Sequence, residues 1–229
     1  MKSRIKKFLA YGIGEIFLIA IGILLALQIN NRNDQRKGKR ELDNILSVVQ
    51  VDLKLNIQEA ETVLEALKIK TSYLNIVFDP GITRDSLYNN PMCFAMNTGF
   101  GDLTIRDRGV NLLHNFKVHN TLSSDSLITE IGAFYAIFSR TNETLSDMIN
   151  DDVVGTLNYY RDHFDWYDRF LEANIEPDMI DDILANTVTR NRLLHHRILI
   201  DGNYSKFLQS FVSNGELLIL DLNARIDDN

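Results

Sequence analysis

Hydrophobic residues are distributed along this chain in two ways. A continuous apolar run occupies residues 8–29, FLAYGIGEIFLIAIGILLALQI, in which Glu15 is the one charged residue. After residue 30, apolar side chains recur every three or four positions, which is typical of amphipathic helices and not of strands. Few breaks interrupt this pattern, since 229 residues include three prolines and twelve glycines. The sequence therefore predicts an all-α protein, with one N-terminal transmembrane helix followed by an up-and-down bundle of long helices.

The apolar run can cross a bilayer only if Glu15 lies within it. Its 22 residues extend about 33 Å as a helix, against a hydrocarbon core of about 30 Å. The uncharged part, residues 16–29, extends only about 21 Å. The basic tail of residues 1–7 would also suit a cleaved signal peptide, but no small-x-small cleavage site follows the run. We therefore expect residues 8–29 to form a single-pass anchor.

Basic residues flank both ends of this expected anchor, so its orientation rests on a small difference. Residues 1–7 carry four basic residues and no acid, whereas Asp34 and Glu41 interrupt the cluster after the run. That second cluster consists of Arg32, Arg36, Lys37, Lys39 and Arg40. The positive-inside tendency then favours a cytoplasmic N-terminus. We therefore expect the large C-terminal domain outside the cytoplasmic membrane, in a periplasm if the cell has one.

Glu15 shares a helix face with small residues. Gly22 and Ala26 follow it by seven and eleven positions, which places all three on about the same side. Gly14 lies beside this face, and small residues four apart allow close helix contact. Gly14, Glu15, Gly22 and Ala26 thus form a predicted packing face for a second copy or another membrane protein. Two alternatives stay open: Glu15 snorkels to the headgroups, or it is a protonatable group coupled to proton flow.

Residues 30–78 predict one long neck helix, similar to a coiled coil, and residues 79–229 the rest of the bundle. Asp79-Pro80-Gly81 is a stop signal. Asn56 and Lys70 are polar positions in the apolar seam; Asn56 either sets a register or weakens the seam, and the second interpretation is favoured. The seam has a 4,3 spacing and comprises Leu42, Leu46, Val49, Leu53, Asn56, Ala60, Val63, Leu67, Lys70 and Leu74.

The remaining helices are expected at 103–108, 110–117, 128–171, 177–200 and 204–225. The Ser-Ser-Asp of residues 123–125 offers an N-cap for the long third helix. The Asp-Gly-Asn of residues 201–203 predicts a turn, and Gly215 a further break.

The stretch of residues 11–37, YGIGEIFLIAIGILLALQINNRNDQRK, resembles the N-terminal signature of an uncharacterised family of small single-pass membrane proteins of flavobacteria and their relatives. Arg32 stands where that family often has a tryptophan. A looser likeness runs through residues 102–138. The resemblance implies an anchor, a helical domain and a Gram-negative envelope setting, and it implies no activity. The matching residues are Gly14, Glu15, Ile16, Ile21, Gly22, Ile23, Ala26, Leu27, Gln28, Ile29, Asn30 and Asn31.

Charge and cysteine content exclude several classes of protein. Residues 30–229 carry 20 basic and 30 acidic residues, a formal charge of −10, so nucleic acid is not an expected partner. Cys93 is the single cysteine, which excludes an intrachain disulfide and a thiolate zinc cluster. We expect Cys93 to be a small buried apolar residue.

Histidines, arginines and aromatics near the C-terminal third are candidate binding groups. Adjacent His195 and His196 point about 100° apart on a helix, so no metal site is expected. The nearby arginines predict either an anion-binding patch or a solvated face; they are Arg190, Arg192 and Arg197. The aromatics of residues 159–170 predict bundle core, or else an exposed partner or ligand surface; its candidates are Tyr159, Trp166 and Phe170.

The chain carries no recognisable catalytic motif, and we expect no cofactor. Serine nucleophile elbows, phosphate-binding glycine loops and dinucleotide fingerprints are absent. The acid pairs at 151–152, 181–182 and 227–228 diverge on a helix and are expected to be solvated. We therefore expect a non-enzymatic, membrane-anchored interaction or scaffold protein of the bacterial envelope. The alternatives are a ligand-sensing module that signals through a membrane partner, and a proton-coupled accessory subunit that uses Glu15.

Overall fold

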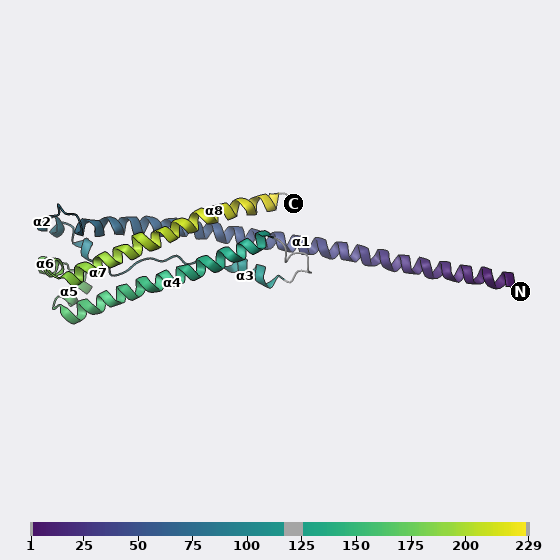
Figure 1. Cartoon of the computed structure of the whole chain (residues 1–229), viewed down its shortest axis with the longest axis horizontal. Coiled ribbons are helices and arrows are strands. Elements are labelled where there is room, and N and C mark those ends of the chain that lie inside the picture. The colour runs from purple at the N-terminus through teal and green to yellow at the C-terminus, as the bar shows by residue number, and fades with distance from the viewer. Residues whose placement is uncertain (1, 117–125, 228–229) are drawn as a thin grey trace.

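The computed structural model describes residues 2–116 and 126–227, with side chains from Glu15 to Ile226 except Ile16. Over these residues the chain forms helices and connecting turns and no strand, so the predicted all-α class is confirmed. The long helices α1, α4 and α8 lie lengthwise beside one another, and the N-terminal part of α1 projects beyond them (Figure 1). The elements are α1 (Lys2–Val77), α2 (Arg84–Tyr88), the 3₁₀ helix η1 (Pro91–Phe94), α3 (Arg108–Asn115), α4 (Ser126–His163), α5 (Tyr167–Leu171), α6 (Pro177–Ala185), α7 (Thr187–Arg197), the π-helix η2 (Ile198–Tyr204) and α8 (Ser205–Asp227).

Helix α1 organises the whole structure. Its 76 residues contain no proline and extend about 114 Å. It ends at Val77, just before the predicted stop at Asp79-Pro80-Gly81. All ten seam positions between Leu42 and Leu74 are buried, including the polar Asn56 and Lys70. The 4,3 pattern therefore identified the face of α1 that packs against the bundle.

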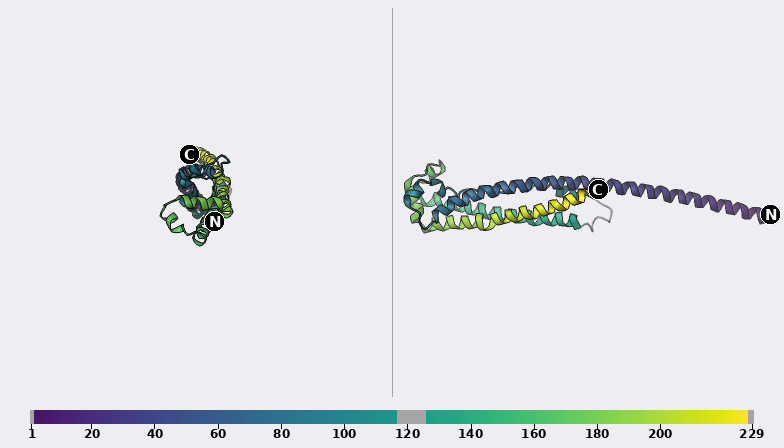
Figure 2. Two further views of the ribbon diagram at one scale, coloured as in Figure 1. Left: turned by 90° about the vertical axis from the view of Figure 1, so that its left-hand side faces the viewer. Right: turned by 90° about the horizontal axis from the view of Figure 1, so that it is seen from above.

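The projecting part of α1 is apolar and exposed. Side chains from Phe17 to Ile29 are all exposed, with Leu18 at 71% of its full accessible surface. Viewed from above, α1 continues past the bundle as one gently curved helix (Figure 2, right). Within the part of the chain that the structure describes, no helix has a stretch both long and apolar enough to span a membrane. The single-pass anchor expected over residues 8–29 stays a prediction.

Helix α8 packs antiparallel to α1 through a glycine contact. A Cβ at Gly215 would lie 3.0 Å from Cδ1 of Ile57 and 3.4 Å from Cδ1 of Leu53. The break predicted at Gly215 is wrong, because this glycine brings α8 close to α1 inside a continuous helix. The turn predicted at 201–203 is also wrong, because these residues belong to η2, which joins α7 to α8.

The smaller helices also depart from the pattern-based boundaries. The helix predicted at 128–171 ends at His163, and α5 follows after a short turn. The helix predicted at 177–200 is divided at Asn186, whose side chain accepts hydrogen bonds from the backbone N–H groups of Val188 and Thr189 and so caps α7. The caps predicted at residues 123–125 lie outside the described residues. Together α2, α5 and α6 cover the end of the bundle opposite the projecting helix (Figure 1).

An extended segment, residues 101–107, crosses the bundle where a helix at 103–108 was expected. Asn56 of α1 is fully buried and makes two hydrogen bonds with the backbone of Arg106: its Oδ1 accepts at 2.8 Å and its Nδ2 donates at 2.9 Å. The Glu59 carboxylate accepts from the Thr104 N–H at 3.1 Å. These side-chain hydrogen bonds satisfy backbone groups that would otherwise be paired within a helix. Asn56 thus has a specific partner, and the interpretation that it merely weakens the seam is wrong.

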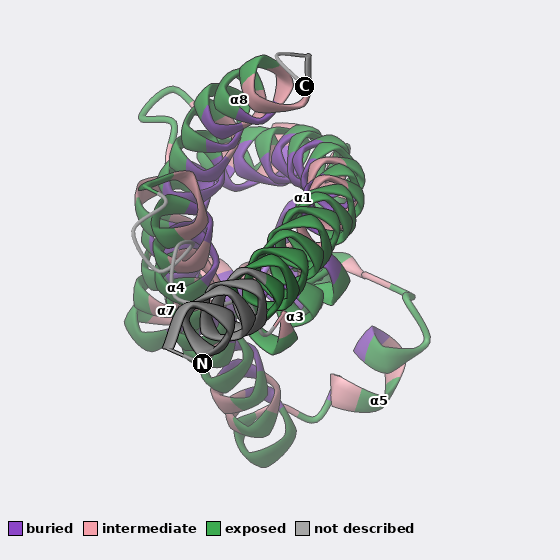
Figure 3. Cartoon of the chain, turned by 90° about the vertical axis from the view of Figure 1, so that its right-hand side faces the viewer, coloured by how far each residue is buried: buried purple, intermediate pink, exposed green. Residues whose placement is uncertain are grey.

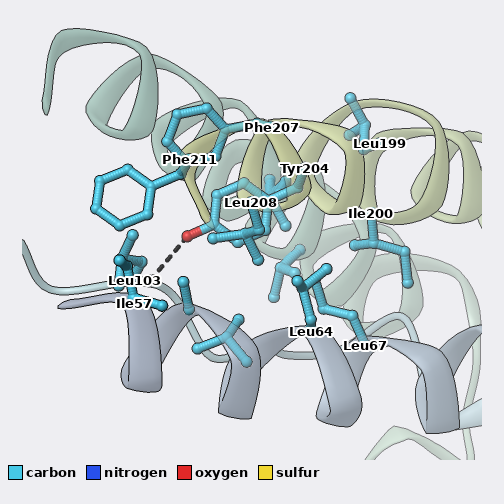
Figure 4. Packing of buried hydrophobic residues seen from close by; sticks show 14 of the residues in the cluster. Ile57, Leu64, Leu67, Leu103, Leu199, Ile200, Tyr204, Phe207, Leu208 and Phe211 are labelled. Carbon is cyan, nitrogen blue, oxygen red and sulfur yellow. Dashed lines mark hydrogen bonds between the residues drawn. The ribbon is translucent and has the colours of Figure 1, made fainter. Parts of the chain in front are cut away.

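A second set of side chains holds the same segment from the other side. The Leu103 N–H donates to the Tyr204 hydroxyl at 2.8 Å, and the Leu103 carbonyl accepts from Asn142 Nδ2 at 2.8 Å. The Tyr204 hydroxyl in turn donates to Asn142 Oδ1 at 3.0 Å. Figure 4 shows Tyr204 reaching Leu103 from among Phe207, Leu208 and Phe211. The closed triangle of Leu103, Asn142 and Tyr204 ties α4 and η2 to the extended segment.

The start of α3 lies directly against α1. The Gly109 N–H donates to Asp52 Oδ2 at 2.7 Å, so a carboxylate from another helix caps α3. A Cβ at Gly109 would lie 2.6 Å from both the Cα and the N of Val49. Buried residues line the faces of α1, α3, α4 and α8 that point inward (Figure 3). Cys93 is also buried, as predicted.

Gly109→Ala should destabilise the protein by about 2 kcal/mol or more, because the new methyl group would overlap backbone atoms of Val49 that cannot rotate away. The measurement is the free energy of unfolding from urea denaturation of the detergent-solubilised chain. Gly132→Ala is the matched control: its Cβ meets nothing within 4 Å, so it should stabilise α4 by roughly 0.5–1 kcal/mol. Equal effects of the two substitutions would contradict the close approach of α3 to α1.

Asn56→Ala should cost about 1–3 kcal/mol, because it leaves the Arg106 backbone without either of its hydrogen bonds to α1. The exposed Asn44, on the same helix, provides the control substitution Asn44→Ala, which should change stability by less than about 0.5 kcal/mol. Hydrogen exchange at the Arg106 amide should also accelerate in Asn56→Ala. An unchanged exchange rate would show that Asn56 does not hold the segment.

Candidate functional site: a buried polar cluster

A group of buried and half-buried polar side chains lies where α7 packs against α1 and α4. Helical spacing places its members on inward faces: residues four apart on α4, and residues three and seven apart on α7. We call this group the polar cluster; it comprises Lys70 and Thr71 of α1, Asp152 and Thr156 of α4, and Thr189, Arg192 and His196 of α7.

His196 and Asp152 form the centre of the polar cluster. His196 Nδ1 lies 2.8 Å from Asp152 Oδ2, and the side chains are 0% and 6% exposed. Loss of hydration lowers the pKa of His196, and nearby Lys70 lowers it further, against the opposing effect of its bond to Asp152. At neutral pH His196 is therefore an uncharged donor through Nδ1, and its Nε2 is an acceptor. The exposed His195 lies farther from the carboxylate, with Nε2 at 3.9 Å from Asp152 Oδ1.

Lys70 adds a buried cation to the polar cluster. Lys70 is 9% exposed. Burial lowers its pKa from 10.5 to about 8, although the charge of Asp152 opposes this shift. Among the described residues, no carboxylate lies within ion-pair distance of the Lys70 ammonium, and no hydrogen-bond acceptor contacts it. Keeping Lys70 charged below pH 8 thus costs stability, and the cost disappears as pH rises from about 8 to 10.5.

Several atoms of the polar cluster are buried without a hydrogen-bond partner. Unpaired buried polar groups are unusual, and each one that occurs calls for an explanation. Within the described chain these atoms are Oγ1 of Thr71, Thr156 and Thr189, Nε of Arg192 and Nε2 of His196.

The π-helix η2 begins two residues after His196. It runs from Ile198 to Tyr204, and the Ser205 hydroxyl donates to the Ile200 carbonyl at 2.8 Å. A π-helical turn is less stable than an α-helical one and occurs often at functional sites. The π-helix η2 therefore follows the polar cluster directly in the sequence.

The aromatic residues predicted as a partner or ligand surface belong to the core. Trp166 is 2% exposed, and its Nε1 donates to Asp182 Oδ2 at 3.0 Å. Phe170 is buried too, and both rings contact the buried ring of Tyr160. Tyr159 is half-buried. The prediction of an exposed docking surface at these residues is therefore wrong, and the alternative prediction, that they belong to the bundle core, is confirmed for Trp166 and Phe170.

The arginines of the predicted anion patch have separate environments. Arg190 is exposed. Arg192 lies over the Tyr159 ring, with Cζ 4.8 Å from its centroid. Arg197 lies over the Phe78 ring of the loop after α1 at 4.6 Å, and donates to Asn75 Oδ1 at 3.1 Å. Arg190, Arg192 and Arg197 thus make no common surface patch, because Arg192 faces α4 and Arg197 faces α1.

The predicted membrane-packing face has no partner within the single described chain. Glu15, Gly22 and Ala26 are exposed, and a Cβ at Gly22 would meet nothing within 4 Å. The surroundings of Gly14 lie outside what the structure describes. Within the described residues, no three histidine, cysteine or acidic side chains are grouped so that they could hold a metal ion.

Comparison with known proteins identifies one similarity. Residues 15–95 match a family described as a family of unknown function (DUF6090). The match covers 81 of 229 residues, from Glu15 through the exposed and buried parts of α1 to η1. It agrees with the resemblance of the N-terminal stretch to an uncharacterised family. No curated protein and no solved structure matches the chain.

Sequence reasoning missed the polar cluster, although one signal was present. Lys70 stood out as a cation in an apolar seam, which marks a buried charge that needs a partner. Asp152 was treated as one of a solvated pair; Asp151 is exposed, while Asp152 points inward to His196. The pairing of residues 44 positions apart depends on the antiparallel register of α4 and α7, which the sequence pattern does not define.

Acidification below pH 6.5 should destabilise the bundle through His196. Because the folded pKa lies below the unfolded value of 6.5, the unfolded state binds more protons in this range, and the free energy of unfolding falls as pH falls. Urea denaturation between pH 7.5 and 5 should show a shallower decline for His196→Gln than for the wild-type chain. His195→Gln, at an exposed ring, is the control and should keep the wild-type slope. Equal slopes for His196→Gln and wild type would contradict a buried neutral His196.

Proposed function

We propose that this protein is a membrane-anchored, non-enzymatic interaction or scaffold protein of the bacterial envelope. The N-terminal part of α1 enters the inner membrane, and the helical bundle lies on the periplasmic side. The observation that carries the proposal is the exposed apolar surface of α1 from Phe17 to Ile29. A single apolar helix exposed on all sides is unfavourable in water, so a bilayer or other helices must cover it.

The length of the anchor depends on residues before Glu15. The 13 residues from Phe17 to Ile29 extend only about 20 Å, which is too short for a hydrocarbon core. Residues 8–14 carry no charge in the sequence and complete a length of about 33 Å. Glu15 then lies roughly 10 Å inside one end, where a carboxylate needs a partner or must reach the headgroups.

Assembly through the anchor gives Glu15 such a partner. Glu15, Gly22 and Ala26 lie on one side of α1 and are exposed in the isolated chain. Gly22 and Ala26 permit close approach of another helix, and Glu15 can hydrogen-bond across the contact. The partner is a second copy of this chain or another membrane protein. The match to the uncharacterised family begins at Glu15, and its span includes this face.

A combined substitution, Glu15→Gln with Gly22→Leu, should weaken assembly at least tenfold, because it removes the carboxylate and blocks the close approach. The measurement is cross-linking of the tagged full-length chain in native membranes, followed by mild detergent extraction and mass determination. Ala20→Leu is the matched control, because it adds the same side chain on the opposite side of the helix and should leave assembly unchanged.

Alkaline carbonate extraction and flotation of the same membranes test the anchor separately. Release of the wild-type chain into the soluble fraction would refute the membrane anchor. Retention of the chain in the membrane, with equal assembly in the wild type and the combined variant, would refute the packing face alone.

A second candidate function is ligand sensing by the bundle, with the signal passed through a membrane partner. The unpartnered buried atoms of the polar cluster favour it, because they leave hydrogen-bonding capacity inside the bundle that the described protein does not use. This function is compatible with the anchor, since α1 belongs both to the cluster and to the projecting helix.

A further inference from the structure

The polar cluster carries more unsatisfied hydrogen-bonding capacity than a small region of a stable core normally does. Buried polar groups without partners cost about 1–3 kcal/mol each, while a whole domain is stable by only about 5–15 kcal/mol. Five such atoms occur on α1, α4 and α7. Lys70, at 9% exposed, lies near them on α1. A ligand from outside the described chain would satisfy these atoms in the folded protein.

Most of the unpaired groups are donors. The Nε of Arg192 can only donate, and the three threonine hydroxyls can donate as well as accept. The nearby Lys70 ammonium is also a donor only. The one obligatory acceptor is Nε2 of neutral His196. The polar cluster therefore has the hydrogen-bonding character of a site for an acceptor.

The charges of the polar cluster do not balance. Lys70 and Arg192 are cations, Asp152 is the one acid among its members, and His196 is neutral at pH 7. Asp152 is already engaged by His196 at 2.8 Å. Tyr159 and Asn186, which lie beside Arg192 and are hydrogen-bonded to each other, carry no charge. Among the members of the polar cluster, one positive charge is therefore left without a compensating negative charge.

We propose that the polar cluster binds a small monovalent anion, of the size of chloride, nitrate or formate, between α1, α4 and α7. Lys70 supplies the charge, and the hydroxyls of Thr156 and Thr189 with Nε of Arg192 supply donors from the other two helices. The anion must be small because the surrounding threonines and His196 are 0–8% exposed. Asp152 is held by His196, so its carboxylate does not occupy the anion position.

The bound anion would connect the helices that meet at this end of the bundle. Within the polar cluster, α4 and α7 are already linked by the contact between Asp152 and His196. Arg192 of α7 also lies close to α4, since a Cβ at Gly155 would be 3.6 Å from its Nη1. Lys70 contributes no hydrogen bond to that network. An anion shared by Lys70 and the α7 side chains would therefore attach α1 to α7 just before η2. Binding of this kind stabilises the folded state by an amount that grows with the logarithm of ligand concentration above the dissociation constant.

The experiment is thermal unfolding of the full-length chain in detergent at pH 7, with sodium gluconate replaced by sodium chloride, nitrate or formate at constant ionic strength. Gluconate is too large for the site and serves as the inert anion. We expect the Tm to rise by about 5 °C when the anion concentration exceeds its dissociation constant roughly tenfold, and to keep rising with the logarithm of concentration beyond that. A Tm that is the same in all four salts would overturn the proposal and assign the polar cluster to internal water.

Lys70→Met is the decisive variant, because methionine keeps the length of the side chain and removes the charge. It should lose at least nine-tenths of the anion-dependent rise in Tm. Lys68→Met is the matched control: Lys68 is exposed, pairs with Glu65 at 2.5 Å, and should keep the full rise. An equal rise in Lys70→Met and the wild type would show a general salt effect and refute the site.

Thr156→Val and Thr189→Val test the α4 and α7 sides without a change in volume. Each should weaken the apparent anion affinity about tenfold, as expected for the loss of one hydrogen bond to a charged group. Isothermal titration with sodium formate provides a readout that does not depend on the stability of the variants. Unchanged formate affinity in both threonine variants would exclude an anion bound between the helices.

Discussion

The backbone of the extended segment, residues 101–107, is the constraint on which the rest of the bundle depends. This segment runs through a helical protein without a neighbouring strand, so side chains must satisfy its N–H and C=O groups. Asn56 and Glu59 of α1 contact it from one side, and Asn142 of α4 and Tyr204 of η2 from the other. The register of α1 relative to α4 and η2 is thereby determined, because a shift of one turn would break bonds on both sides. A polar contact thus defines an arrangement that apolar packing alone would leave adjustable.

Helix α1 has different surroundings along its length, and its sequence changes accordingly. Between Leu42 and Leu74 one face of the helix carries the apolar seam, and that face is buried in the bundle, while Val51, Leu55 and Ile69 are exposed. Between Phe17 and Ile29 the helix is apolar on all sides and exposed. The intervening residues 30–41 are rich in basic side chains and continue the same helix without a break. Any force or contact applied to the projecting part is therefore transmitted to the bundle through one rigid element and not through a flexible linker.

The sequence allowed the helical class, the stop after Val77 and the buried face of α1 to be predicted, because these depend on local spacing and on proline and glycine positions. It did not reveal that Asn56 holds Arg106, that Asp52 caps α3, or that Asp152 meets His196. Each of these contacts joins residues at least 44 positions apart, so it depends on how helices are placed in space. The same limit explains Gly215 and Gly109: a glycine that permits close helix packing has the same appearance in a sequence as one that ends a helix.

The two ends of the bundle differ in what holds α1 to its neighbours, and this difference bears on function. Near α3, α1 contacts α8 and α3 through close apolar packing at Gly215 and Gly109. At the other end, α1 meets α4 and α7 across the polar cluster, where buried atoms lack partners and a π-helix follows. Local opening requires the least free energy where packing is least complete, so the end at the polar cluster should open before the end at α3. Conformational change in this protein is therefore expected at the end of α1 opposite the projecting helix, and the continuity of α1 connects that end to the N-terminal region.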